Sequence, residues 1–84
     1  MINKEILKKQ IIYRSTHRGS KEMDILLGNF VKIHIDKLNE EELKEVEKLL
    51  FIEDEILHQW YFNKKDNKII PKNKISEMLK EFKL

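Results

Sequence analysis

The sequence predicts an all-α fold, a small bundle of about five short helices. Its 84 residues include only two glycines and one proline, which leaves few of the turns that hairpins need and argues against an all-β fold. Apolar residues instead recur at spacings of three and four along much of the chain, which is the period of an amphipathic helix. At this length we expect a single domain over residues 1–84.

Each helix is predicted by an apolar stripe, and two stripes lie in the N-terminal part of the chain. The first helix is expected to run towards Tyr13, and the second to continue through Gly28, although glycine costs about 1 kcal/mol inside a helix. The first stripe consists of Ile6, Leu7, Gln10 and Ile11. The second consists of Met23, Leu26, Leu27, Phe30 and Val31, with His34 at its border.

Three further stripes follow in the C-terminal part. The third helix is expected to start at Asn39, because Glu42 three residues later resembles a capping box. The fourth follows the acidic turn 53–55, and a polar loop over residues 64–72 precedes the fifth. The three stripes are Leu43, Val46, Leu49 and Leu50; then Ile56, Leu57, Trp60 and Tyr61; then Ile75, Met78, Leu79 and Phe82. We expect the two aromatic residues of the fourth stripe to belong to the core rather than to a stacking platform.

The charge is small overall but unevenly distributed. The formal net charge is +2, yet residues 35–60 carry nine acidic and three basic groups. Residues 1–34 and 61–84 each carry seven basic and three acidic groups. A uniformly basic nucleic-acid binder would not place an acidic block at its centre, so this distribution suits a protein partner at least as well as a polyanion.

Composition and spacing also limit the kinds of site. The absence of cysteine excludes disulfides, thiol catalysis and cysteine-based metal centres. The three histidines lack the spacing of a helical metal pair, and we expect His58 to pair with Asp54 on a helix surface. With no phosphate loop or nucleophile–base pair evident, we expect no catalytic, cofactor-binding or metal-binding residues. No apolar run approaches the ~18 residues of a membrane span and no signal peptide is evident, so we expect a cytoplasmic bacterial protein without membrane insertion.

The segment between the first two expected helices carries the strongest local signals. Gly19 suits the left-handed position that ends a helix, and Ser20 suits the N-cap of the next. Glu22 and Asp24 would then lie in or near the first turn, where the helix dipole favours negative charge.

Both arginines of the chain lie in or beside this segment. Fifteen of the 17 basic residues are lysine, and the two exceptions, Arg14 and Arg18, are four residues apart. We expect them to share one face of the first helix near its C-terminus, with His17 at the border of that face. A guanidinium offers a planar fork for carboxylate or backbone oxygens that lysine lacks, so the pair could serve either tertiary capping or a partner protein.

The same segment resembles the signature of the succinate dehydrogenase flavinylation factors, also called succinate dehydrogenase assembly factors or flavinators. The core motif of that family is Arg-Gly-x-x-Glu, present here as Arg18, Gly19 and Glu22, with an acid following at Asp24. The resemblance is specific over residues 13–30 and extends over nearly the whole chain. The later landmarks are Leu38, Asn39, Glu42, Leu49, Leu50, Asp54, Leu57, Trp60 and Pro71.

This resemblance implies a five-helix assembly factor that is not itself an enzyme. Such a factor binds the flavoprotein subunit of succinate dehydrogenase, and in bacteria often that of fumarate reductase, and promotes covalent attachment of FAD to that subunit. FAD is attached to the partner, so no cofactor is expected to stay bound to the factor, which we expect to be monomeric when free. The resemblance places the contact surface at Arg18, Gly19 and Glu22, with Asp24, His17 and Arg14 as neighbours.

Two alternatives from other classes remain open on sequence grounds. Two helices joined by a glycine turn and flanked by Arg14, Arg18 and Lys21 could form a helix-turn-helix regulator that binds nucleic acid. The chain could also be an antitoxin-type protein-interaction module. The acidic centre and the scarcity of arginine argue against nucleic acid as the partner.

Overall fold

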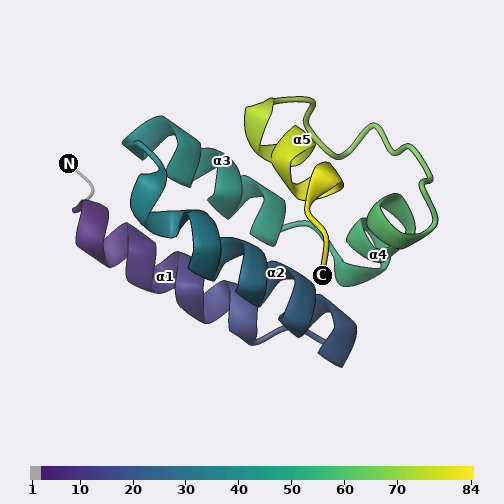
Figure 1. The fold of residues 1–84 in the computed structure, drawn as a ribbon, viewed down its shortest axis with the longest axis horizontal. Coiled ribbons are helices and arrows are strands. Elements are labelled where there is room, and N and C mark those ends of the chain that lie inside the picture. The colour runs from purple at the N-terminus through teal and green to yellow at the C-terminus, as the bar shows by residue number, and fades with distance from the viewer. Residues whose placement is uncertain (1–2) are drawn as a thin grey trace.

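A computed structural model describes residues 3–84 and confirms the predicted all-α class. Within this range the chain forms five α-helices and one short 3₁₀ turn, and no strand (Figure 1). In chain order the elements are α1 (Lys4–Thr16), α2 (Lys21–His34), η1 (Ile35–Lys37), α3 (Glu40–Leu50), α4 (Asp54–Phe62) and α5 (Lys74–Glu81).

The first three helices form the body of the molecule. α1 and α2 pack side by side as an antiparallel hairpin (Figure 1), and α3 packs mainly against α1. Gly28 lies where α2 approaches the end of α1, since a Cβ atom at this position would lie 3.5 Å from Cγ2 of Thr16. A methyl group at Gly28 would thus only reach ordinary van der Waals contact, so the helix contains this glycine despite its poor helix propensity and not because the packing requires it.

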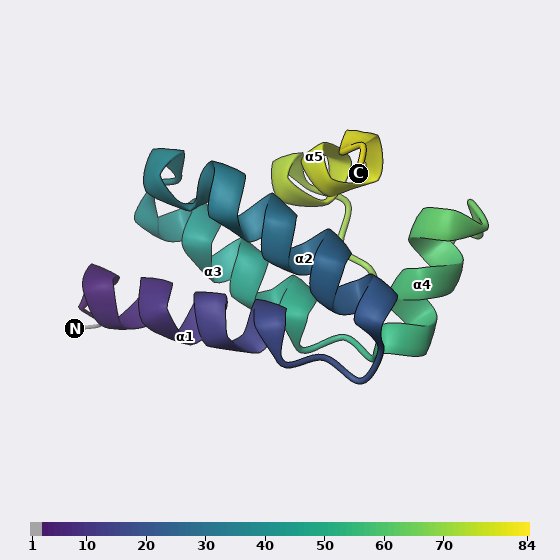
Figure 2. The same ribbon diagram turned by 60° about the horizontal axis from the view of Figure 1, so that its bottom comes forward.

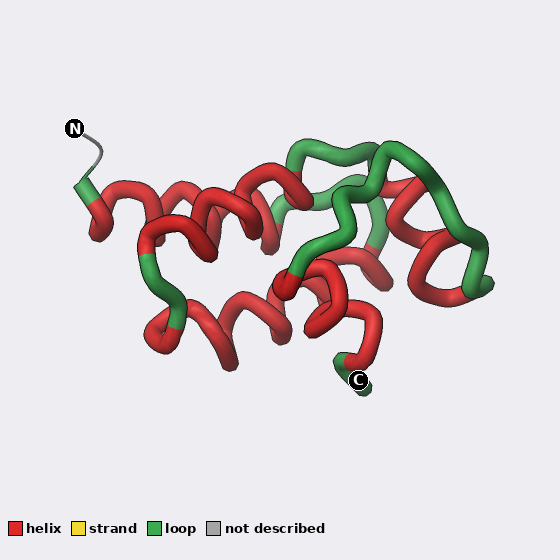
Figure 3. Tube along the Cα trace, turned by 90° about the horizontal axis from the view of Figure 1, so that it is seen from above, coloured by secondary structure: helices red, strands yellow, loops and turns green. Residues whose placement is uncertain are grey.

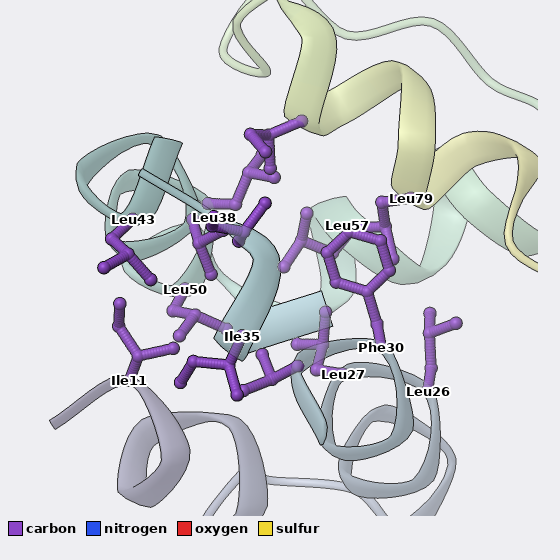
Figure 4. Close-up of a cluster of buried hydrophobic side chains, with 14 of the residues drawn as sticks. Ile11, Leu26, Leu27, Phe30, Ile35, Leu38, Leu43, Leu50, Leu57 and Leu79 are labelled. Carbon is purple, nitrogen blue, oxygen red and sulfur yellow. The ribbon is translucent and has the colours of Figure 1, made fainter. Parts of the chain in front are cut away.

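The core is built from the apolar stripes of all five helices, which converge between them (Figure 4). Four of the five predicted stripes face this core, with only their flanking members partly exposed. The stripe of α1 was predicted in part wrongly, because Ile6 is 54% exposed and Gln10 also faces solvent. The buried face of α1 instead follows a spacing of four, through Leu7, Ile11 and Ser15.

Side-chain caps define where the helices begin. Ser20 accepts a hydrogen bond from the backbone N–H of Met23 and so caps α2, as predicted. Asn39 and Glu42 form the predicted capping box at α3, in which each side chain accepts from the other residue's backbone N–H. Each cap satisfies backbone donors that a helix terminus leaves unpaired, and these local bonds fix the turns between the helices.

The loop before the last helix is also where the sequence predicts it. It follows α4 and returns to the start of α5, which lies against α3 (Figure 3). Ile70 anchors the loop in the core with an exposed fraction of 4%. Trp60, at 6%, is a core residue as predicted, and the half-buried Tyr61 packs against the core. None of the helices within residues 3–84 is both long and apolar enough to cross a membrane.

The capping box predicts a pH dependence of stability. The backbone N–H of Asn39, followed by the ammonium group of Lys74 at 3.0 Å, lowers the pKa of Glu42 from its ordinary value of 4.5. Because the folded-state pKa is depressed, the stabilisation is present above pH 4.5 and is lost as the pH falls through the lower folded value. Glu42→Gln is therefore expected to lower the Tm at pH 7 and to have a progressively smaller effect as the pH falls below 4.5. Thermal unfolding followed by circular dichroism checks this, and a Tm difference that stays constant with pH would contradict it.

Candidate partner-binding site

Two turns that are distant in sequence lie side by side at one end of the molecule. One is the α1–α2 turn, residues 17–20, and the other is the α3–α4 turn, residues 51–53 (Figure 2). Arg18 and Gly19 of the first turn bond to the second turn and to the start of α4. This junction, which we call the turn lock, consists of Arg18, Gly19, Asp24 and Asp54.

The guanidinium of Arg18 is the centre of the turn lock. Its Nε and Nη2 atoms each lie 2.7 Å from Oδ1 of Asp54. Its two terminal nitrogens also donate to the backbone carbonyls of Leu50, Ile52 and Arg14, at 2.5, 3.0 and 3.4 Å. These five contacts equal in number the five N–H donors of a guanidinium. The Arg18 side chain is only 9% exposed, so its positive charge is paired with Asp54 within the protein rather than presented to solvent.

The position of Arg18 corrects the prediction about the two arginines. α1 ends at Thr16, so Arg18 lies beyond the helix and does not share a helical face with Arg14. The guanidinium carbon of Arg14 instead lies 4.3 Å from the ring centre of Phe51, an exposed residue of the α3–α4 turn. Arg14 therefore forms a cation–π pair at the surface, while Arg18 turns inward.

Gly19 is needed for a different reason from the predicted one. Its φ does not lie in the left-handed region, so the prediction of a left-handed helix end at this position was wrong. Its backbone N–H donates to Oδ2 of Asp54 at 2.7 Å. A Cβ atom on Gly19 would lie 3.2 Å from the same oxygen, which is closer than an ordinary van der Waals contact. The residue is small so that the Asp54 carboxylate can approach the backbone.

Asp24 holds the turn from the other side. It lies in the first turn of α2, as predicted, and its Oδ1 accepts a hydrogen bond from the backbone N–H of Arg18. The Arg18 backbone is thus bound by Asp24 while its side chain is bound by Asp54. Two carboxylates from different helices therefore fix one residue of the turn.

Glu22 and His17 face solvent beside the turn lock. Glu22 lies in the first turn of α2, and its side chain makes no hydrogen bond or ion pair with any other residue in the range 3–84. The ring of His17 stacks on Tyr13 at 3.9 Å between centroids, and its Nδ1 lies 2.8 Å from the Tyr13 carbonyl oxygen. Glu22 is therefore available to a partner, and the exposed His17 can contact one while its Nδ1 keeps the bond to the Tyr13 carbonyl.

The predicted partner of Asp54 was also wrong. Asp54 was expected to pair with His58, but its two oxygens bind Arg18 and Gly19. The ring of His58 packs instead against Phe62, at 4.6 Å between centroids. The available signal was an acid shortly after the third apolar stripe, which does not reveal a partner 36 residues earlier in the chain.

Nothing in the described range suggests a metal centre at this junction. Residues 3–84 contain no group of three or more histidine, cysteine or acidic side chains that could hold a metal ion. A cavity of about 550 Å³ lies elsewhere, between α4, the following loop and α5, with Trp60 and Pro71 in its lining. The predicted site residues contribute nothing to that lining. The turn lock is thus suited to presenting a surface rather than to enclosing a ligand.

A comparison with known families identifies the lineage of this chain. The model of the family described as "Flavinator of succinate dehydrogenase" matches residues 9–83. The chain belongs to this family. The matched residues of the flavinator family include the entire turn lock and Glu22, so the Arg-Gly-x-x-Glu resemblance and the family assignment concern the same residues.

Curated relatives agree with this assignment. A protein of Acetobacter pasteurianus named "FAD assembly factor SdhE" is 34% identical over 73 residues, which cover 87% of this chain and 64% of that protein. A Dictyostelium discoideum protein named "Succinate dehydrogenase assembly factor 2, mitochondrial" is 36% identical, covering 94% of this chain and 57% of its own length. The chain thus spans about six-tenths of the length of these flavinator-family relatives. No solved structure matches it.

Proposed function

We propose that this chain binds the flavoprotein subunit of succinate dehydrogenase and promotes the covalent attachment of FAD to that subunit. The observation that carries the proposal is the family match, which extends through the turn lock and Glu22. The names of the relatives, an FAD assembly factor and a succinate dehydrogenase assembly factor, support the same activity.

The chain acts in this proposal as a helper of a reaction that the flavoprotein itself performs. The Asp54 carboxylate is occupied by Arg18 and Gly19, and Glu22 is an exposed carboxylate whose side chain has no hydrogen-bond or ion-pair partner within residues 3–84. A general acid or base is normally held in place by neighbouring groups within hydrogen-bond reach of the reacting atoms. The factor therefore holds the flavoprotein in a conformation that permits it to bond FAD, and FAD stays with the partner.

The predicted contact residues take two different roles in this proposal. Glu22 and His17 are exposed and contact the flavoprotein directly. Arg14, together with the Phe51 ring that it stacks on, lies at the edge of the same contact surface. Arg18, Gly19 and Asp24 bond mainly to one another and to Asp54, and they act by fixing the shape of that surface. Pre-organised side chains lose little conformational entropy on binding, so a rigid turn favours recognition.

In this structure Arg18, a cation that the helix-turn-helix alternative needs for binding nucleic acid, is not available at the surface. The guanidinium of Arg18 is directed at a carboxylate and three carbonyls and is only 9% exposed, so a nucleic-acid phosphate would have to displace bonds already made. The observed geometry therefore favours a protein partner.

A reconstituted reaction tests the proposed function. Purified flavoprotein subunit lacking covalent flavin is incubated with FAD, with and without this protein, and covalent FAD is measured by flavin fluorescence after denaturing electrophoresis. We expect the protein to accelerate attachment at least tenfold while forming a complex with the subunit. An unchanged rate would overturn the proposal. The flavoprotein of fumarate reductase, a second client implied by the family resemblance, is tested by the same assay.

Glu22→Gln is expected to separate binding from folding. Because Glu22 is exposed and unpaired within residues 3–84, the Tm should change by less than about 3 °C. The loss of a charge at the contact surface should slow flavin attachment about tenfold or more. Glu41→Gln is a matched control, since Glu41 is an exposed acid in the first turn of α3. Equal activity of the two variants would place Glu22 outside the contact surface.

A further inference from the structure

We propose that Asp54 is a positioning residue for flavin attachment and acts as the distant fourth member of the Arg-Gly-x-x-Glu motif. This inference rests on the proposed function and assigns a role to a residue that lies 32 positions after Glu22. Asp54 acts through Arg18 and Gly19, which it holds in place, and is not itself a contact with the partner.

One oxygen of the Asp54 carboxylate binds a side chain of the motif, and the other binds the motif's backbone. Oδ1 accepts from Nε and Nη2 of Arg18, and Oδ2 accepts from the backbone N–H of Gly19, with all three donor–acceptor distances at 2.7 Å. The Asp54 side chain is 23% exposed, so these bonds are partly shielded from water. Charge-assisted bonds of this length are the stronger class of hydrogen bond in proteins. One side chain on α4 thus fixes two successive residues of the α1–α2 turn.

The bonds of Asp54 are directed away from its own helix. α4 begins at Asp54 after Glu53, whose side chain makes no capping hydrogen bond. α1, α2, α3 and α5 each begin with a side chain that caps their own backbone. An acid at the start of a helix commonly interacts with that helix's free N–H groups, whereas both oxygens of Asp54 bind the α1–α2 turn.

The link from Asp54 to the exposed surface is short. Gly19 directly precedes Ser20, which caps α2, and Glu22 follows in the first turn of that helix. The Arg18 backbone is bound to Asp24 on the same helix. Movement of Gly19 away from Asp54 would therefore move the start of α2 and change the direction in which Glu22 is presented. Small displacements of a positioned group suffice to impair a contact that depends on geometry.

Asp54→Asn tests this inference with little change in volume. An asparagine has one oxygen in place of two and carries no charge, so it cannot accept from Gly19 while also neutralising Arg18. We expect flavin attachment to slow at least tenfold with the variant full-length protein. We also expect the amide proton resonance of Gly19 to shift in the NMR spectrum, because its acceptor is changed. Arg18→Ala combined with Asp54→Asn should be hardly slower than the slower single variant, because both act on one junction.

A stability-matched control separates positioning from general weakening. Ile75→Val shortens a fully buried side chain on α5, away from the turn lock, and is expected to lower the Tm without shifting the Gly19 resonance. Its flavin-attachment rate, measured at a temperature where both variants are folded, should stay within twofold of the parent protein. If Asp54→Asn is as active as the parent, or if Ile75→Val loses as much activity, the inference is overturned. Failure of the parent protein itself to promote attachment would overturn the proposed function instead.

Discussion

Replacing Arg18 with alanine is expected to lower the Tm by about 10–20 °C, because it destabilises the fold by about 2–3 kcal/mol. The change leaves the Asp54 carboxylate without its charge partner and removes donors from the carbonyls of Leu50 and Ile52. Breaking a largely buried pair in this way costs more than the pair contributes, since the remaining charge stays desolvated. Flavin attachment should be lost as well, because the α1–α2 turn is released.

Arg14→Ala is the matched control for this prediction. Arg14 is the chain's other arginine, and its cation–π contact with the exposed Phe51 is worth about 0.5–1 kcal/mol. Thermal unfolding followed by circular dichroism should therefore show a loss of only a few degrees. If Arg18→Ala unfolded at the same temperature as Arg14→Ala, the turn lock would not be a stabilising junction.

Replacing Gly19 with valine is expected to abolish most of the flavin-attachment activity, with a loss of at least tenfold. A Cβ atom at this position would lie 3.2 Å from Oδ2 of Asp54, and the two methyl groups of valine add further bulk there. The carboxylate must move, which breaks its bond to the Gly19 N–H and weakens its hold on Arg18. We expect a stability loss of about 1–2 kcal/mol, because one hydrogen bond is lost and a second is distorted.

The second glycine of the chain provides the control. A Cβ atom on Gly28 would make an ordinary 3.5 Å contact with Thr16, and alanine is favoured over glycine inside a helix. Gly28→Ala should therefore leave flavin attachment unchanged and leave stability equal or slightly increased. Comparable activity of the Gly19→Val and Gly28→Ala variants would contradict the proposed tight approach of Asp54 to Gly19.

The helices were predictable because their determinants are local. Ser20 and Asn39 cap helices whose first turns lie within three residues, so the sequence spacing alone reveals the bond. The buried stripes follow the helical period, and Phe30 and Leu57 lie in the core as their spacing predicts. The buried face of the first helix was predicted in part wrongly because the helix places Ile6 and Tyr13 in solvent, which weakens its periodic signal.

The turn lock was not predictable in the same way. Asp54 is 36 residues from Arg18 in sequence, and only the folding of α3 against the helix hairpin brings them within 2.7 Å. A glycine beside an expected helix end favours the interpretation of a left-handed cap, whereas Gly19 is small because a carboxylate approaches its backbone. The motif could therefore be found from the sequence, while the reason for each of its residues required tertiary contacts.

These contacts give the residues of the motif different roles. Arg18 and Gly19 are internal to the junction, and Glu22 is the motif residue that remains free within the described range. Substitutions at Arg18 should therefore alter both stability and activity, whereas substitutions at Glu22 should alter activity alone. Measuring both quantities for each variant distinguishes residues that shape the surface from those that touch the partner.

In-gel flavin fluorescence of the succinate dehydrogenase flavoprotein, compared between parent cells and cells in which the gene for this protein is deleted, tests the proposed function most directly. We expect the deletion to leave the subunit with little covalent FAD and the intact gene to restore it. A gene carrying Glu22→Gln should restore much less. Undiminished flavin fluorescence in the deletion would contradict the proposed function.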